Sequence, residues 1–508
     1  MIPSLITYKQ IAADNTWISI LPEVMLGLLA LLLLVLELVL PKRYYGSIPR
    51  IAVWAQFAIL GFTIAFSKAE HPMYFNTSFS GLLLHSFRGE VMRVFFLLSS
   101  MLVCFLGGIY LDRRNLPRVE FFHIVIIITA GLMLLVQSNN FIMFFVSLET
   151  VTVGFYVLVS YCRNSAYSLE AGLKYLILGA ASSAMLLFGI VLLYGACGNP
   201  NLAWSSGDPL NFEALEYFIE ANPGNILVIG GVVLVIAGVA FKIGAVPFQI
   251  WIPDVYQGAP TPVTAFLAVA SKAGGFMILL NLIEGPFSAL QGLLVPLLST
   301  VAALTILFGN FAALSQRNVK RMMGLSGIAH AGYMLMGVVA SFTVPWASGA
   351  VLFYLFVYLF ASFGVFSVMT FMAPEEDSLQ NLEDYEDLAR DNPFLGTVLA
   401  VGVGSLAGIP PFAGFIAKLL IFIAAYKAGL FALLAVAVFG VVVSIYYYFG
   451  WIMAAFFNRS RQPDEESREA RERPLPVVDS THRIVMGTIT AITIALGFYQ
   501  GAMGFLLF

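Results

Sequence analysis

The stretch TAFLAVASKAGGFMILL, residues 264–280, decides the fold because it is almost wholly apolar and carries Lys272 at its middle. An apolar run of about 20 residues can cross a bilayer as a helix. A charged ammonium at the bilayer centre costs at least about 2.5–3.5 kcal/mol, so a lysine placed there is rare and usually functional. Five further ionisable residues lie in similar apolar runs: Lys174, Lys242, Lys418, Glu149 and His330. Together these residues predict a buried polar series through a membrane protein.

The composition agrees with that class. Of the 508 residues, 60% are hydrophobic and 11% are charged, whereas soluble domains carry about 25% charged residues. The net charge of −3 gives no indication of nucleic-acid binding. The three cysteines lack a C-x-x-C spacing, and the chain has no phosphate-cradling or dinucleotide-binding glycine motif. The sequence therefore predicts no metal and no cofactor bound by this chain.

Apolar runs between helix breakers predict an all-α membrane protein with about fourteen transmembrane helices. The spans lie near 18–40, 50–67, 91–111, 119–137, 139–161, 168–194, 225–248, 260–283, 289–311, 319–341, 346–373, 393–427, 430–457 and 484–506. The twelfth is too long for one straight crossing and contains Gly408, Pro410 and Pro411. The seventh ends near Pro247. Because proline interrupts helices, we expect broken helices at both places.

Basic residues predict the orientation of the chain. The loops after odd-numbered spans, with their flanks, hold 17 of the 26 Lys and Arg residues, and the opposite side holds 5. Since basic loops face the cytoplasm, both termini are predicted on the periplasmic side. The acidic segment 374–392 and the mixed-charge segment 458–483 fall on the cytoplasmic side. Either could dock a partner, but solvated loops are the ordinary interpretation of such charge runs.

Spans 4–8 and 9–13 are predicted to be two copies of one five-helix unit. Lys418 follows Lys242 by 176 residues and His330 follows Glu149 by 181, so matching positions carry ionisable residues. Because five is odd, the second copy must enter from the other side, which gives inverted repeats of the transporter type. The predicted domains are an N-terminal three-helix region, the two repeats, and a cytoplasmic loop with the last span: 1–117, 118–283, 289–457 and 458–508.

The buried ionisable residues can carry protons. An apolar environment disfavours the charged form of a lysine and a nearby carboxylate favours it, so a lysine whose partner changes can take up and release a proton. Glu149 is the evident partner, for which Lys174 or Lys242 could compete. His330 suits a relay between lysines, although a hydrogen-bonded structural histidine is the alternative. For the lysines the alternatives are static ion pairs or snorkelling. Aromatic packing is favoured over water-chain support for Tyr354, Tyr358 and the run 446–448.

Three segments carry a resemblance to a known family. They are FKIGAVPFQIWIPDVYQGAPTPVTAFLAVASKAGG (241–275), NVKRMMGLSGIAHAGYML (318–335) and LAGIPPFAGFIAKLLIF (406–422). With fourteen spans, the chain resembles the antiporter-like membrane subunits of respiratory complex I, the NADH:quinone oxidoreductase. The resemblance covers essentially the whole chain and is weakest before about residue 90.

This resemblance implies proton translocation coupled to quinone reduction elsewhere in the complex. NADH, FMN, iron–sulfur clusters and quinone are expected in partner subunits, and the partners are other complex I membrane subunits and the lipid bilayer. The implied location is the bacterial inner membrane. The implied roles are a carboxylate at Glu149, its modulator at Lys174, an input-side lysine at Lys242, a central lysine at Lys272, a continuation of the hydrated axis at His330 and an output lysine at Lys418.

Two other functions fit parts of the sequence. An Mrp-type cation/proton antiporter subunit shares the fold and the lysines. Sodium transport, however, favours additional carboxylates and carbonyl ligands, whereas this polar series is dominated by lysine. A purely structural membrane scaffold is the poorest interpretation, because a scaffold gains nothing from buried lysines.

Overall fold

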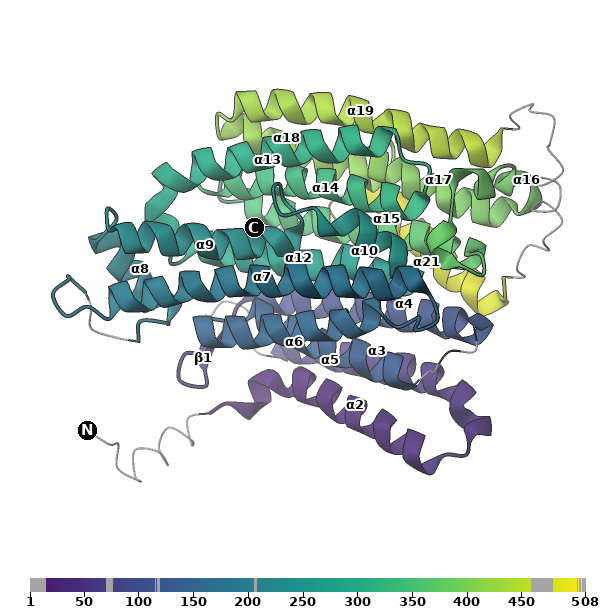
Figure 1. Ribbon diagram of the computed structural model, residues 1–508, viewed down its shortest axis with the longest axis horizontal. Helices are drawn as coiled ribbons and strands as arrows, with labels where there is room; N and C mark the ends of the chain where they lie inside the picture. The colour runs from purple at the N-terminus through teal and green to yellow at the C-terminus, as the bar shows by residue number, and fades with distance from the viewer. Residues whose placement is uncertain are drawn as a thin grey trace. The chain divides into compact units, whose positions relative to one another are not determined.

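The described part of the chain is almost entirely helical (Figure 1). The structure is a computed structural model, and it describes residues 15–69, 76–114, 116, 119–204, 208–457, 478–499, 501 and 504. Thirteen helices among these residues are long and apolar enough to cross a membrane. In lipid a backbone must satisfy its own hydrogen bonds, so helices are the form that such apolar runs take. The predicted all-α membrane fold is confirmed.

The chain divides into two compact units, and the first comprises Met1–Leu158, Leu176–Lys242 and Ala273–Gln291. Within it α2 packs against α5, and α4 packs against α3 and α5. A short hairpin, β1 paired antiparallel with β2, precedes α4. The elements that lie wholly or mostly in this unit are η1 (Trp17–Ile20), α2 (Leu21–Val39), η2 (Lys42–Ser47), α3 (Ile48–Ala69), β1 (Asn76–Ser78), β2 (Leu83–His85), α4 (Phe87–Arg114), α5 (Val119–Val136), α6 (Phe141–Val159), α7 (Ala166–Cys197), α8 (Phe212–Ala221), α9 (Ile226–Ile243), α12 (Lys272–Glu284) and η4 (Ser288–Leu290).

The second unit comprises Val159–Tyr175, Ile243–Lys272 and Gly292–Phe508. Within it α15 packs against α14, α17, α18 and α21, and α14 packs against α10 and α18. Its elements are α10 (Trp251–Gly258), α11 (Thr261–Phe266), the π-helical turn η3 (Leu267–Ser271), α13 (Gln291–Leu314), α14 (Val319–Ser341), α15 (Ala347–Met372), η5 (Asp377–Leu379), η6 (Leu382–Tyr385), α16 (Leu388–Asp391), α17 (Pro393–Ala407), α18 (Ala413–Lys427), α19 (Phe431–Phe456) and α21 (Ser480–Phe498).

Two helices form the interior of the second unit. In the apolar 18-residue stretch of α14 every residue is buried, and in the same length of α15 the buried share is 94%. By contrast, only 33% of the apolar 18-residue stretch of α19 is buried. A helix that is apolar all round belongs in the core of a large helical protein, whereas one with an exposed face borders lipid or a partner. Polar residues on α14 and α15 are therefore held inside protein.

Both predicted helix breaks are present. The seventh predicted span ends as α9 at Ile243, and the chain resumes a helix only at α10. The twelfth predicted span is divided into α17 and α18. At each break a glycine adopts a positive φ, 75° at Gly244 and 80° at Gly408, which residues with a Cβ rarely adopt. The broken crossing accounts for the difference between thirteen uninterrupted membrane helices and fourteen predicted spans.

The acidic segment 374–392 is solvated at most of its charges, as the charge pattern predicts, but not at Asp377. Asp377, Gln380 and Tyr385 of this segment are buried. The prediction is wrong for Asp377 because its carboxylate accepts hydrogen bonds from buried donors of the same unit and does not need water. Of the mixed-charge segment 458–483, only 478–483 belongs to the described residues. The inverted repeats and the domain boundaries stay predictions.

Candidate functional site

Lys242 lies in the last turn of α9 and is only 6% exposed. Its Nζ donates to the Thr152 hydroxyl over 2.5 Å, and that hydroxyl donates to the Leu148 carbonyl over 2.7 Å. Glu149 precedes Thr152 by one helical turn, so both side chains project from the same face of α6. The Glu149 carboxylate acts electrostatically on Lys242. The lysine is thus held by a neutral hydroxyl with a carboxylate close by.

Glu149 itself has a hydroxyl partner. Ser183, which is buried on α7, donates to Glu149 Oε1 over 2.5 Å. A hydrogen bond to an ionised carboxylate is stronger than one between neutral groups, so Ser183 fixes the orientation of this carboxylate. Thr152 and Ser183 were missed by sequence reasoning. Helical spacing could have found Thr152, which lies at i+3 from Glu149 on the face that the carboxylate occupies, but not Ser183, which lies on another helix.

Lys272 lies where the helix that spans Thr261–Glu284 changes its winding. The π-helical turn η3 ends at Ser271, immediately before it. Such turns are rare and are frequently found at functional sites. The lysine is 2% exposed, and its Nζ donates to the Gly327 carbonyl on α14 over 2.6 Å. The same Nζ lies 5.2 Å from the centre of the Tyr358 ring. A buried ammonium is therefore held by one main-chain oxygen beside an aromatic face.

His330 is buried on α14, and both of its ring nitrogens have tyrosine partners. Nδ1 lies 2.8 Å from the Tyr354 hydroxyl, and Nε2 lies 3.1 Å from the Tyr448 hydroxyl. Lys272 and Lys418 both act electrostatically on this imidazole. Tyr354 and Tyr448 make the predicted ring contacts, and in addition each buried hydroxyl finds a hydrogen-bond partner in His330. Tyr446, in contrast, is 74% exposed.

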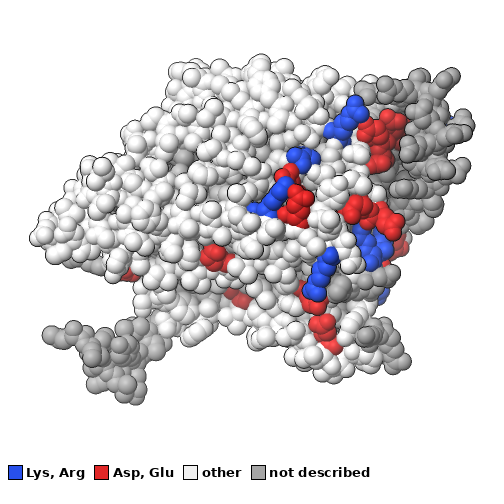
Figure 2. Space-filling view, in the orientation of Figure 1, with Lys and Arg blue, Asp and Glu red and all other residues white. Residues whose placement is uncertain are grey.

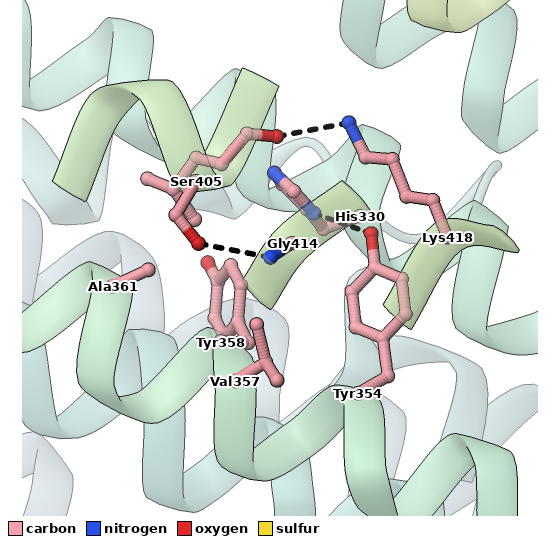
Figure 3. Close-up of a pocket in the computed structure, with 9 residues that line it drawn as sticks. His330, Tyr354, Val357, Tyr358, Ala361, Ser405, Gly414 and Lys418 are labelled. Atoms are coloured by element: carbon pink, nitrogen blue, oxygen red, sulfur yellow. Dashed lines mark hydrogen bonds between the residues drawn. The ribbon is translucent and has the colours of Figure 1, made fainter. Parts of the chain in front are cut away.

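Lys418 projects from α18 towards the end of α17 and is 3% exposed. Its Nζ donates to the carbonyls of Leu406 and Ala407, both over 2.9 Å. The last carbonyls of a helix lack partners within that helix and carry the negative end of its dipole, which favours a cation there. Figure 3 shows Lys418 bonded to a main-chain oxygen, with His330 nearby. The break thus creates the acceptors that hold the ammonium.

A small cavity lies among these groups in the second unit. The space open to the centre of a water molecule is about 10 Å³, roughly what one water needs. Among the described residues, the Tyr358 hydroxyl is buried without a hydrogen-bond partner. The lining includes one imidazole, one ammonium, three hydroxyls and apolar groups (Figure 3): His330, Tyr354, Val357, Tyr358, Ala361, Ser405, Leu406, Gly414 and Lys418. The described residues turn no polar surface towards this space, so it is large enough for one water but gives that water no hydrogen-bond partner.

Lys174 differs from the other lysines. Its side chain is 42% exposed, so the expectation of burial is wrong for it. It pairs with Glu170 one turn earlier and with Asp254 on α10, both over 2.7 Å. Arg321 also pairs with Asp254 over 2.7 Å. Figure 2 shows paired basic and acidic side chains of this kind on a surface that is otherwise largely uncharged.

The two cations decide the charge state of Asp254. Partial burial alone would raise the pKa of this carboxyl, but its hydrogen bonds to Lys174 and Arg321 outweigh burial and hold the pKa below its ordinary value. Asp254 is therefore an anion at neutral pH. Sequence reasoning named Glu149 as the partner for which Lys174 competes, and it overlooked Asp254, which follows Pro253 at the start of α10.

The side chains of this site are of types that can form hydrogen bonds and exchange protons. Within the described residues, no group of three or more His, Cys, Asp and Glu side chains could hold a metal ion. The groups that are present can each exchange or transmit a proton: ammonium, imidazole, carboxylate and hydroxyl. Chemically, the first unit offers a lysine beside a carboxylate, and the second offers two lysines that share one imidazole.

Comparison with known proteins gives a consistent family. Residues 138–444 match the model of the NADH:quinone oxidoreductase/Mrp antiporter membrane family. The chain is 55% identical over 496 residues to NADH-quinone oxidoreductase subunit N 1 of Opitutus terrae, with 98% of each chain covered. It is 35% identical over 444 residues to subunit N of Rhodospirillum rubrum, which covers 87% of this chain and 88% of that one.

Solved structures agree with this result. A chain of respiratory complex I from Thermus thermophilus, solved with bound aureothin, matches with a TM-score of 0.76 and 29% identity over 94% of this chain and 97% of that one. A chain of the Mrp complex from a Dietzia species matches with a TM-score of 0.77 over 97% and 96%, but at 20% identity this likeness shows the fold alone. The chain belongs to the antiporter-like, proton-translocating membrane subunits of this family, in the subunit N group of NADH-quinone oxidoreductase.

Proposed function

We propose that this subunit moves protons through Glu149 and Lys242 in the first unit and through Lys272, His330 and Lys418 in the second. The observation that carries the proposal is the bonding of His330. Both ring nitrogens are bonded to tyrosine hydroxyls, and two buried lysines act electrostatically on the ring. A static structural histidine needs one or two hydrogen bonds but no buried lysines near its ring.

In the first unit, the protonation state of Lys242 depends on Glu149. When Glu149 is ionised, its charge favours the ammonium form of Lys242, and when it is protonated that support is lost. The Thr152 hydroxyl can accept a hydrogen bond from the lysine in its charged form and donate one to it in its neutral form. A change at Glu149 therefore loads or unloads Lys242 without a large movement of either helix. Lys174 would modulate this step through its own carboxylate partners, Glu170 and Asp254.

In the second unit, a proton would pass between Lys272 and Lys418 by way of His330. The imidazole can take a proton on one nitrogen while it releases one from the other, and the hydroxyls of Tyr354 and Tyr448 can follow by rotating. Two ammonium groups close to one ring repel each other, so charging one lysine favours release from the other. His330 and Lys418 line the same small cavity, so the two side chains lie close together in the second unit.

The wider assignment follows the relatives. Subunits with the names reported above work in NADH-quinone oxidoreductase, so this chain would act as a non-redox, proton-translocating subunit beside other membrane subunits of that complex. NADH, FMN, iron–sulfur clusters and quinone would be bound by its partners. Both termini would face the periplasm, and the domains would follow the boundaries 1–117, 118–283, 289–457 and 458–508.

The test uses the assembled complex in membrane vesicles. We expect Glu149→Ala, Lys242→Ala and Lys272→Ala to lower proton uptake per NADH oxidised by about a hundredfold, the usual range for a lost acid–base group, with assembly retained. Lys427→Ala is the matched control, because Lys427 is an exposed lysine on α18. Uptake at the wild-type level in all three variants would rule out the proposed route. If the protein alone exchanged sodium for protons in liposomes, the Mrp-type alternative would replace the proposal.

A further inference from the structure

A second buried charge pair lies in the second unit, at the start of α14, and the route proposed above does not use it. Lys320 is fully buried, and its Nζ lies 3.0 Å from Asp377 Oδ2. Asp377 comes from the acidic segment and is 7% exposed. Burying two charges is expensive and is repaid only by close geometry and further hydrogen bonds. The Lys320–Asp377 pair therefore needs hydrogen bonds that stabilise it and a role that explains why it is buried.

Asp377 makes those further hydrogen bonds. It accepts the Thr261 backbone N–H and the Thr261 hydroxyl, each over 2.8 Å. Gln380 donates to its other oxygen over 2.5 Å, and the Tyr385 hydroxyl donates to Gln380 over 2.8 Å. We call Thr261, Lys320, Asp377, Gln380 and Tyr385 the Asp377 clamp. Every member is buried, so the clamp is a closed polar network inside protein.

The clamp joins three segments at the place where the chain turns from α10 into α11. Pro260 precedes α11 and supplies no side-chain cap, so the Thr261 N–H depends on Asp377. Lys320 also donates to the carbonyl of Ala259, the residue at the end of α10, over 2.6 Å. An anion at a helix start complements its dipole, and the lysine neutralises that anion. The first turn of α14 is thereby fixed to the first turn of α11.

The helix that begins as α11 and continues through η3 into α12 meets α14 again at Lys272. Lys272 lies eleven residues, about three turns, after Thr261, and Gly327 lies seven residues, about two turns, after Lys320. Their contact is the 2.6 Å hydrogen bond from Lys272 Nζ to the Gly327 carbonyl. A helix that slides along its neighbour by one residue moves by about 1.5 Å, which is enough to break this bond. The clamp and the Lys272 contact therefore both require the same alignment of the two helices along their length.

We propose that Lys320 and Asp377 are positioning residues that set the register between α11 and α14 and so hold the Lys272 ammonium against the Gly327 carbonyl. This inference rests on the proposed function, because it assumes that Lys272 carries protons. It also assigns a role to the acidic segment, which supplies the carboxylate that fixes the helix carrying the central lysine. The charge of Asp377 is thus used inside the protein.

The competing role for Lys320 is that of a proton carrier, and charge removal separates the two. Asp377→Asn leaves a buried ammonium without its counter-charge, so the register should loosen. Lys320→Gln combined with Asp377→Asn removes both charges but keeps groups that can hydrogen-bond to Thr261 and to each other. A positioning role predicts recovery in the double variant, and a proton carrier cannot recover, because glutamine does not titrate.

The experiment measures proton uptake per NADH oxidised by assembled complex in membrane vesicles, with the amount of assembled complex read from a native gel. Asp377→Asn should lower uptake about tenfold, less than the hundredfold that a 1 Å displacement of a reacting group can cost. The double variant should return to within about twofold of wild type. Wild-type uptake in Asp377→Asn, or a double variant as impaired as the single one, would overturn the proposal.

Two further arms keep the test decisive. If Asp377→Asn prevents assembly, Thr261→Ala replaces it, because it removes the hydroxyl bonded to Asp377 and leaves the backbone N–H bond. Thr261→Ser is its matched control, because it removes only the methyl group. Reduced uptake in the alanine variant with normal uptake in the serine variant supports positioning, and normal uptake in both overturns it.

Lys272→Ala is measured in parallel. If that variant pumps normally, the proposed function fails, whereas normal pumping in Asp377→Asn alone removes only the clamp. Glu375→Ala, an exposed acidic neighbour in the same segment, should behave as wild type.

Discussion

Lys242 and Lys418 each lie beside a helix break, but their partners differ in kind. Lys242 donates to a side chain, the Thr152 hydroxyl, and has the Glu149 carboxylate in electrostatic reach. Lys418 donates to two main-chain carbonyls at the end of α17. One lysine is therefore held by groups that can change their protonation or rotate, and the other by oxygens that cannot.

The difference shows which group can act as a switch. A carboxylate that gains a proton loses its charge, so the field at Lys242 can be changed by chemistry at Glu149. The carbonyls of Leu406 and Ala407 keep the same dipole in every state, so the field at Lys418 can change only if the lysine or the helix end moves. We infer that the first site responds to its neighbour, whereas the second is a fixed acceptor cluster at which a proton arrives or leaves.

The largest expected effect comes from replacing each lysine by methionine, which keeps much of the side-chain volume. Both Lys242→Met and Lys418→Met should lower proton uptake per NADH by about a hundredfold. Only Lys418→Met should also destabilise the complex, because it leaves two buried carbonyls without their donor at about 1–3 kcal/mol each. In Lys242→Met the Thr152 hydroxyl keeps its bond to the Leu148 carbonyl. The measurements are vesicle proton uptake and the temperature at which the solubilised complex loses activity.

A control substitution tests whether the loss of any positive charge from α18 has the same effects. Lys427→Met removes an exposed lysine from the same helix and should change neither quantity. Equal thermal stability for the Lys242 and Lys418 variants would contradict the distinction between side-chain and main-chain partners, whatever happened to pumping.

Much of this architecture could be predicted from the sequence. The spans and the breaks after Lys242 and before Lys418 follow from apolar run length and from proline and glycine, which act locally along the chain. The acidic segment could not be predicted in this way. Whether Asp377 is solvated depends on Lys320 and Thr261, which are distant in sequence and meet it only in the folded unit.

The candidate site was predictable in its titratable residues but not in their partners. Lysine and histidine stand out in an apolar run, so Lys272 and His330 are visible at once. Tyr354 and Tyr448 do not stand out, because tyrosine is ordinary in such helices and its hydroxyl becomes informative only when it meets an imidazole. For Lys174, the sequence shows the lysine but not Asp254, its partner across the unit.

An intermediate effect is expected from the tyrosines that bond His330, and it tests whether the Lys418 side depends on a relay. Tyr354→Phe and Tyr448→Phe each remove one hydroxyl and should each lower proton uptake about fivefold, the value of one lost hydrogen bond of roughly 1 kcal/mol. Tyr446→Phe is the control, because Tyr446 is exposed on the same helix as Tyr448. The double variant should be worse than either single one. Normal uptake in the double variant would mean that His330 needs neither hydroxyl and that the relay does not include them.

The smallest expected effect concerns the hydroxyl that holds Lys242. Thr152→Val keeps the shape of the side chain but removes the acceptor 2.5 Å from Lys242 Nζ. We expect proton uptake to fall by only about twofold to threefold, because Glu149 remains to support the ammonium and offsets part of the roughly 1 kcal/mol that one hydrogen bond is worth. Thr129→Val is a matched control, since the Thr129 hydroxyl bonds the Val125 carbonyl of its own helix, α5. Combining Thr152→Val with Glu149→Gln should add little to the loss from Glu149→Gln alone, because the hydroxyl assists a switch that is then absent. A clear additional loss would show that Thr152 is itself a step in the route.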